Sequence, residues 1–294
     1  MTELDAYEAQ PGEIAGLGES PPEAEAGLPP PRVGRRALRR RSRRALAVWA
    51  IRLVAVAVVV GIWEWLGRRD GGVFVAPFST TVRHLVDLWR NGSLGTAMWR
   101  SNEALLIGFP ISAVVGLPLG FLLGRVRLAD RGLSYFLDVA LVIPMIAIVP
   151  VIIVALGLTL TARVVVVIAF ALPIVALNAR AAVRIVETHL IEMSGAFGAS
   201  RLQVWRTVIV PSSFAPVFTG LRVGLAHAIS GMIVIELTLI PAGLGGLIVQ
   251  FRSEFAAGDL YAVTLMILIE GLVLVGAAHA IERLVADRLG KTDG

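Results

Sequence analysis

Six long apolar runs, separated by segments that hold most of the charges, dominate the pattern of hydrophobic and polar positions along the chain. They lie at about 45–66, 103–124, 137–158, 164–179, 217–240 and 260–281. A helix of about 20 apolar residues crosses the hydrocarbon core of a bilayer, and only a helix or a closed barrel satisfies its own backbone there. The pattern therefore predicts an all-α integral membrane protein with about six transmembrane helices. The fourth is the shortest.

Helix breakers, small residues and one polar stretch refine this prediction. Membrane helices tolerate proline but are kinked by it, and prolines interrupt the runs at positions 110, 118, 144, 150 and 173. Small residues that allow close helix contact recur in the second run at Gly108, Gly116, Gly120 and Gly124. Between the first two runs, residues 79–90 have the spacing of an amphipathic surface helix. Its first residues, Ser79, Thr80 and Thr81, suit a helix cap.

The polar segment at 192–211, between the fourth and fifth runs, has a helical pattern of its own. Its large apolar residues recur on one helical face, at Leu202, Trp205 and Val208. Gly198 favours a turn between two short helical pieces, and Pro211 is expected to end the second piece. The segment is too charged for lipid. We therefore expect a structured surface loop that another molecule holds.

The chain before the first run differs in composition from the rest. Residues 1–31 contain seven acidic residues, six prolines and few large apolar side chains, which predicts disorder. Eight arginines follow by position 44, as is typical of a cytoplasmic flank beside anionic lipid. A signal peptide is disfavoured, because the run ends in Trp63-Glu64-Trp65 rather than in small residues. We divide the chain into a tail, 1–44, and a transmembrane domain, 45–294, with its core at about 92–284.

Counts of arginine and lysine orient the predicted helices. With the N-terminus inside the cell, the inner segments hold 18 of these residues and the outer segments hold seven. Inner loops of membrane proteins carry such an excess of positive charge. Both termini are therefore expected in the cytoplasm, together with the loop at 180–213. The 26 arginines and one lysine indicate this topology rather than nucleic-acid binding.

Residues that the chain lacks exclude several kinds of chemistry. Without cysteine there is no thiol catalysis and no Cys-ligated metal. The single lysine, Lys291, lacks the upstream glycine of a phosphate-binding P-loop, so the chain carries no ATP site of that kind. The sequence shows no cluster of His, Asp and Glu with the spacing of metal ligands.

The segment at 192–211 resembles the signature of importer-type ABC transporter permeases. Glu192 stands at the expected distance before Gly198, and nine residues separate Gly198 from Val208. Val210-Pro211 closes the pattern, whereas Met193-Ser194 replaces two alanines that are usual in the family. Further motifs are similar to those of the nitrate, sulfonate and taurine group: Gly198-Ala199-Ser200-Arg201, Gly220-Leu221-Arg222, Ile235-Glu236 and Gly243-Leu244-Gly245-Gly246-Leu247-Ile248.

This resemblance implies the fold of a type I ABC importer permease with a cytoplasmic coupling helix. The residues it assigns to the ATPase-coupling loop are Glu192, Gly198, Ala199, Ser200, Arg201 and Pro211. It implies a multi-pass protein of the bacterial plasma membrane, in which a permease homodimer joins two ATP-binding subunits and an extracytoplasmic substrate-binding protein. ATP and magnesium would lie on the partner ATPase, so this chain would bind no cofactor and would not be an enzyme. The solute would be a small anion such as an aliphatic sulfonate, taurine or nitrate.

Ionisable residues inside the predicted helices are candidates for function, because a charge within a bilayer is costly. Glu236 lies in the outer half of the fifth helix, where it either faces the pathway or a gate or makes a hydrogen-bonded packing contact. Arg222 either pairs with Glu270 across helices or attracts an anion. His227 and His279 lie on apolar faces and are expected to pack there.

An ATP-independent secondary transporter or channel is the alternative function. It requires internal repeats or a coupling-ion site, and the sequence shows no convincing repeat. An intramembrane serine protease is a weaker alternative, because no serine forms a recognisable motif with any of the four histidines.

Overall fold

The computed structural model describes residues 35–72 and 74–289, and every regular element within them is helical. The predicted disorder of residues 1–31 lies outside this range. The chain divides into two units, with the boundary in the sequence between Val58 and Val59. In the first unit, α1 (Arg35–Arg69) begins inside the arginine-rich block.

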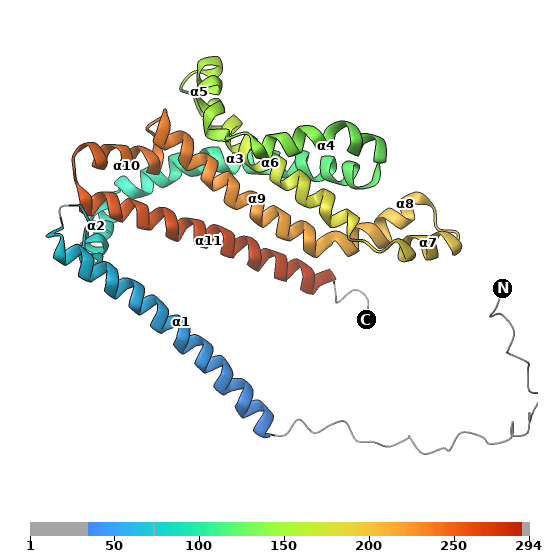
Figure 1. Cartoon of the computed structure of the whole chain (residues 1–294), viewed down its shortest axis with the longest axis horizontal. Helices are drawn as coiled ribbons and strands as arrows, with labels where there is room; N and C mark the ends of the chain where they lie inside the picture. Colours follow the sequence, from blue (N-terminus) through green and yellow to red (C-terminus); the bar gives the residue numbers. More distant parts are fainter. Residues whose placement is uncertain (1–34, 73, 290–294) are drawn as a thin grey trace, which may run out of the picture. The chain divides into compact units, whose positions relative to one another are not determined.

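The second unit contains the last turns of α1 and all the other helices (Figure 1). These are α2 (Phe78–Arg90), α3 (Ser93–Arg125), α4 (Arg127–Val142), α5 (Met145–Leu156), α6 (Leu160–Arg184), α7 (Thr188–Ala196), α8 (Arg201–Val204), α9 (Val210–Thr238), α10 (Gly243–Ser253) and α11 (Ala257–Leu289). A π-helical turn, Trp205–Ile209, joins α8 to α9. Within this unit α2 and α10 lie at one end, and α7 and α8 lie at the other (Figure 1).

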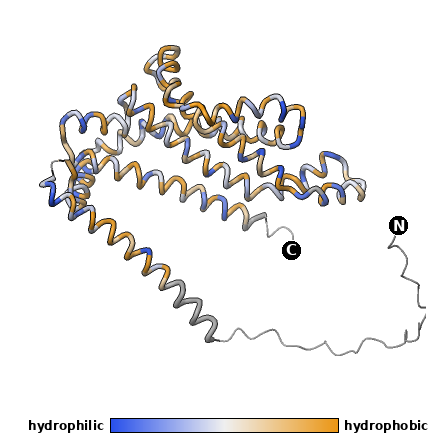
Figure 2. Tube along the Cα trace, viewed as in Figure 1, coloured by the Kyte–Doolittle hydropathy of each residue, from blue (hydrophilic) through white to orange (hydrophobic). Residues whose placement is uncertain are grey.

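Hydropathy along the helices confirms the predicted all-α membrane fold. Hydrophobic residues run along most helices, and hydrophilic residues gather near their ends (Figure 2). Five segments among the described residues are long and apolar enough to cross a membrane: Ala47–Arg69, Ser93–Arg125, Leu160–Arg184, Arg201–Thr238 and Ala257–Ala286. A sixth crossing is present if α4 and α5 form one bent span. The short fourth run, predicted at 164–179, lies within the 25 residues of α6 and is therefore long enough to span.

Close packing of α3 and α9 against α6 forms the centre of the second unit. A Cβ atom added at Gly120 of α3 would lie 2.3 Å from the carbonyl oxygen of Ala176 in α6. One added at Gly224 of α9 would lie 2.5 Å from Val175 Cγ2. Glycine is therefore required at these crossings, because any side chain would force the backbones apart. The glycine spacing in the second run predicted this contact.

The third run is divided into two helices rather than forming one span at 137–158. The axes of α4 and α5 differ by 99° across the break at Ile143 and Pro144. Pro144 has no N–H to donate, and a residue before proline is driven out of the helical conformation. Ile143 accordingly adopts extended angles, with φ −67° and ψ 125°. The proline predicted a kink in this run, but not one of this size.

The start of α2 is capped by another helix, which corrects the prediction that Ser79 to Thr81 cap it. The carboxylate of Glu64 in α1 accepts hydrogen bonds from the backbone N–H of Ser79 at 2.9 Å and from its hydroxyl at 2.9 Å. The N-terminus of a helix favours such a negative charge, because its first N–H groups lack partners within the helix. The amphipathic helix itself is as predicted, with Thr81 and Leu88 buried.

Candidate functional site

The segment at 192–211 contains the predicted turn between two helical pieces. Gly198 separates α7 from α8 and has φ +79°, a conformation that side chains other than hydrogen disfavour. A Cβ atom added there would meet nothing within 4 Å, so glycine is needed for its conformation and not for space. Ser200 then starts α8 with a capping box, in which Gln203 Oε1 accepts the Ser200 N–H at 2.7 Å.

One side of this segment is anchored to the membrane helices. Val204 and Ile209 are buried against Val183 of α6. The ring of Trp205 meets Phe121 of α3 edge-on, with centroids 6.2 Å apart. These contacts fix the loop on the ends of α3 and α6 by apolar burial.

Leu202 does not share this buried face, which corrects the predicted stripe of Leu202, Trp205 and Val208. Its side chain is 60% exposed, while Trp205 and Val208 pack against the buried cluster. The π-helical turn at Trp205–Ile209 explains the difference. It holds more residues per turn than an α-helix, so the apolar spacing no longer follows one α-helical stripe.

Pro211 does not end the second piece, which is a further correction. The helix continues from Arg201 to Thr238 without a break. Before the proline the helix widens, and the Val210 N–H donates to the carbonyl of Trp205, five residues back. Pro211 has no N–H to donate, and its ring needs space in the preceding turn. The wide π-helical turn lies directly before it and provides that space, so the helix can continue.

The opposite side of the segment is exposed and carries large apolar side chains. Met193 is 52% exposed and Phe197 is 84% exposed, in addition to Leu202. The predicted coupling residues Glu192, Gly198, Ser200, Arg201 and Pro211 are also exposed, whereas Ala199 is half-buried against the loop's own core. We call the exposed set Glu192, Met193, Phe197, Ser200, Arg201 and Leu202 the loop surface.

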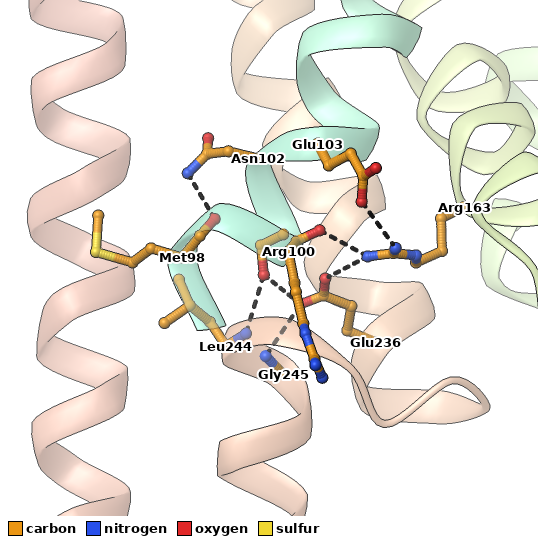
Figure 3. Close-up of polar contacts among 9 residues, drawn as sticks. Met98, Arg100, Asn102, Glu103, Arg163, Glu236, Leu244 and Gly245 are labelled. Atoms are coloured by element: carbon orange, nitrogen blue, oxygen red, sulfur yellow. Dashed lines mark hydrogen bonds and ion pairs between the residues drawn. The ribbon is translucent and has the colours of Figure 1, made fainter. Parts of the chain in front are cut away.

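Glu236 is fully buried, and it lies beside Leu244 and Gly245 at the start of α10 (Figure 3). Its Oε2 accepts hydrogen bonds from the hydroxyl of Ser101 at 2.8 Å and from the N–H of Gly245 at 3.0 Å. Ser101 in turn accepts the N–H of Leu244 at 2.9 Å. Of the two roles left open for Glu236, this burial favours the hydrogen-bonded packing contact. The carboxylate joins α9, α3 and the start of α10.

An arginine completes this cluster (Figure 3). Arg163 of α6 donates to the carbonyl oxygen of Arg100 at 2.7 Å, and its Nη1 lies 3.7 Å from Glu236 Oε1. Its Nη2 also lies 3.7 Å from Glu103. From the sequence, Arg163 is expected only as a charge of an outer loop, and Ser101 is not among the predicted site residues. The sequence feature that could have identified both residues is their position, because each lies just before an apolar run.

The glycines that follow α9 allow this cluster to close. Gly243 has φ +61°, and a Cβ atom added to it would lie 2.2 Å from Ser101 Oγ. A Cβ atom at Gly245 would lie 2.4 Å from Glu236 Cβ. A cavity of about 520 Å3 opens beside them. Its polar lining comes from Asn91, Ser93, Thr96, Arg100 and Gln250.

Arg222 and Glu270 do not pair, which corrects the predicted contact. Nη1 of Arg222 lies 2.6 Å from His279 Nδ1 and 3.3 Å from Glu282 Oε2. Glu270 instead accepts a hydrogen bond from Asn102 of α3. In α11, Glu270 precedes Glu282 by three helical turns, so the two carboxylates lie at different depths. His279 is thus part of a polar cluster and not an apolar packing residue.

The described residues contain no group of three or more His, Cys, Asp and Glu side chains that could hold a metal ion. Ionisable side chains instead form ion-pair clusters, one around Glu236 and Arg163 and another around Arg222 and Glu282.

Comparison with known proteins agrees with this architecture. Residues 116–291 match the family described as the binding-protein-dependent transport system inner membrane component. An ABC transporter permease protein of Methanocaldococcus jannaschii is 30% identical over 243 residues, which cover 80% of this chain and 90% of that protein. The taurine transport system permease protein of Escherichia coli is 27% identical over 211 residues, covering 69% of this chain and 76% of that protein.

Two further relatives and one solved structure extend these similarities. The nitrate import permease protein of Synechocystis is 24% identical over 79% of this chain and 87% of its own. An aliphatic sulfonates transport permease protein of Bacillus subtilis is 25% identical over 88% of this chain and 95% of its own. An inward-facing structure of the MetNI methionine ABC transporter has the same fold, with a TM-score of 0.58 and 24% identity over 65% of this chain and 95% of that chain.

Proposed function

Because the chain belongs to the family of binding-protein-dependent transport system inner membrane components, we propose that it forms the translocation pathway of an ATP-driven importer and is coupled to a separate ATPase by the loop at 192–211. The single observation that carries this proposal is the two-sided loop. One side is anchored on α3 and α6, and the other presents the loop surface, in which Phe197 is 84% exposed. An exposed apolar set rimmed by charges is typical of a protein interface.

The anchored side explains how movement of the loop reaches the membrane helices. The helix that begins at Arg201 continues through the π-helical turn into α9, so a force on the loop surface acts on a membrane-spanning helix directly. Val204 and Ile209 pass the same displacement to α6. ATP and magnesium lie on the partner ATPase in this account, and this chain binds no cofactor.

The proposed assembly contains a second copy of this chain, as a homodimer, two ATP-binding subunits and an extracytoplasmic substrate-binding protein. It lies in the bacterial plasma membrane with both termini in the cytoplasm, as the excess of inner arginines supports. The loop surface then faces the cytoplasm, where an ATPase is available.

The proposed solute is a small anion: an aliphatic sulfonate, taurine or nitrate. Support comes from the relatives described as permeases for taurine, nitrate and aliphatic sulfonates. Growth of a deletion strain on each compound as sole sulfur or nitrogen source tests this. Growth that is lost on one compound and restored by the gene identifies the solute. Unchanged growth on all three refutes this solute class.

Co-purification tests the coupling loop. Glu192→Arg reverses a charge on the loop surface, and Gly198→Arg places a large charged side chain at an exposed position next to it. Both are expected to release the ATP-binding subunit during purification from native membranes. Glu254→Arg is the control, because it makes the charge change of Glu192→Arg, which is larger than that of Gly198→Arg, at an exposed position just after α10, at the other end of the unit. Retention of the ATPase by both loop variants would show that the assignment is wrong.

A further inference from the structure

The exposed face of α9 contains polar residues at membrane depth. From Ser212 onward its exposed side chains share one face of the helix and are Ser212, Ala215, Thr219, Val223, Ala226, His227, Ser230, Leu237 and Thr238. The opposite face is buried: Gly220, Gly224 and Ala228 pack against α6, and Glu236 bonds to α3 and α10. Three polar side chains, Thr219, His227 and Ser230, lie in the middle of this face. We call these three the α9 stripe.

Two other spanning helices provide a comparison within the same molecule. Between positions 106 and 122, the exposed residues of α3 are all apolar: Leu106, Ile107, Pro110, Ile111, Val114, Val115, Pro118 and Leu122. Between positions 268 and 281, those of α11 are apolar or glycine: Leu268, Ile269, Leu272, Val273, Gly276, Ala277, Ala280 and Ile281. Faces of this kind suit lipid, in which polar side chains are disfavoured. The α9 stripe has the opposite character.

His227 is the residue of the stripe that most needs a polar neighbour. Its Nδ1 lies 3.0 Å from the carbonyl oxygen of Val223. A carbonyl only accepts, so Nδ1 carries the hydrogen and the ring orientation is fixed. Among the described residues, Nε2 has no hydrogen-bond partner. The hydroxyls of Thr219 and Ser230 are satisfied by carbonyls of their own helix, those of Ala215 and Ala226.

We propose that the α9 stripe lines the aqueous passage of the transporter and that His227 Nε2 forms a hydrogen bond with the solute as it crosses. This inference rests on the proposed transport function and names the residues that the solute meets. The occupant of the face is water and solute. Contact with lipid would leave Nε2 without a partner in hydrocarbon, which is costly. His227 is thus a specificity-determining residue of the pathway.

The natural absence of cysteine makes the accessibility of this face directly measurable. Thr219→Cys, His227→Cys and Ser230→Cys each place one thiol on the stripe. Val114→Cys and Leu272→Cys place one on the apolar faces of α3 and α11. The complete transporter, with its ATP-binding subunit and in membrane vesicles, is treated with a charged, membrane-impermeant methanethiosulfonate. The reagent reacts with the thiolate, which forms in water and not in lipid. The stripe positions should therefore react at least about tenfold faster than the controls.

Two results would overturn the inference. Labelling of the stripe at the same slow rate as Val114→Cys and Leu272→Cys would place the stripe in lipid. Slow labelling together with an oxidative disulfide between the His227→Cys residues of two copies would place it in the dimer interface. Neither result bears on ATP-dependent uptake by the unmodified chain, so the proposed transport function is tested independently of this inference.

The KM for solute uptake tests separately whether His227 contacts the solute. His227→Ala removes the ring and should raise the KM for uptake of the solute identified by growth about tenfold, the effect of losing one hydrogen bond. His227→Gln retains a group that can hydrogen-bond and should recover part of this loss. An unchanged KM in both variants would refute the contact.

Discussion

The buried carboxylate of Glu236 depends on donors that come from two other helices. The Ser101 hydroxyl of α3 and the Gly245 N–H of α10 provide them, and Arg163 adds a positive charge at 3.7 Å. Removing the partner of a buried polar group lowers the free energy of unfolding by more than the net contribution of the hydrogen bond itself, because the group is left unsatisfied. The cluster therefore determines how α10 is held against α3 and α9.

Ser101→Ala is expected to destabilise the protein by about 2 kcal/mol, because it leaves both Glu236 and the Leu244 N–H with one partner fewer. Ser112→Ala is the matched control. Ser112 is equally buried, but its hydroxyl bonds only to the Gly108 carbonyl of its own helix, so the cost should be about 0.5 kcal/mol. Thermal unfolding in detergent measures both. Equal losses would show that Ser101 does not hold the cluster.

Gly243→Ala should cost about 3 kcal/mol, because the new methyl group meets Ser101 Oγ at 2.2 Å and the backbone is left-handed there. Gly95→Ala serves as the control. A Cβ atom at Gly95 meets nothing within 4 Å inside α3, so this change should be neutral or should stabilise by about 0.5 kcal/mol. A neutral Gly243→Ala in the same unfolding assay would contradict the close fit.

At the scale of the elements, the loop at 192–211 separates two tasks. Val204, Trp205 and Ile209 hold it to α3 and α6, and the loop surface, which is proposed to bind the ATPase, remains exposed. The two faces should therefore respond differently to substitution.

Trp205→Ala removes the contact with Phe121 and should lower the free energy of unfolding by about 2 kcal/mol. Leu202→Ala should change that free energy by less than about 0.5 kcal/mol, since the side chain is already exposed. The same Leu202→Ala should weaken co-purification of the ATP-binding subunit. If Leu202→Ala lowers stability as much as Trp205→Ala and leaves the complex intact, the assignment of the two faces is reversed.

Asp130 connects two further elements. Its carboxylate lies 2.7 Å from Arg180 Nε and 2.5 Å from Arg184 Nη2, so the start of α4 is tied to the end of α6. Both arginines lie close in sequence to Val183, which contacts the loop. The pairs thus join the start of α4 to the helix against which the loop packs, and which the loop is proposed to move.

Asp130→Asn should lower stability by less than about 1 kcal/mol, because these pairs are partly exposed. Its larger effect should be on coupling, with ATP hydrolysed per solute transported rising above that of the unmodified protein. Asp138→Asn, an exposed aspartate of the same helix, should change neither quantity. An unaltered ratio for Asp130→Asn would exclude a role for the pairs in coupling.

Hydropathy was sufficient to predict five of the six expected spans as continuous helices, because the bilayer constrains length and polarity over about 20 residues at a time. Local geometry within them was less predictable. Neither the 99° break at Pro144 nor the π-helical turn before Pro211 follows from composition. The partner of Arg222 and the contact of Ser101 with Glu236 both depend on how deep helices far apart in the sequence lie relative to one another. The sequence pattern does not specify these depths.

At the scale of the whole molecule, most exposed side chains of the spanning helices are apolar and suit a bilayer, whereas the loop surface and the α9 stripe do not. The first is proposed to face an ATPase and the second a solute. We propose that ATP hydrolysed on another chain drives transport through this one by way of the loop at 192–211.

Uptake of radiolabelled solute by proteoliposomes tests this claim most directly. The vesicles contain the permease, the ATP-binding subunit that purifies with it and the binding protein. We predict uptake that requires ATP on the ATPase side and that Gly198→Arg abolishes, while Glu254→Arg transports at the normal rate. Equal uptake with and without ATP, or normal ATP-driven uptake by Gly198→Arg, would contradict the account.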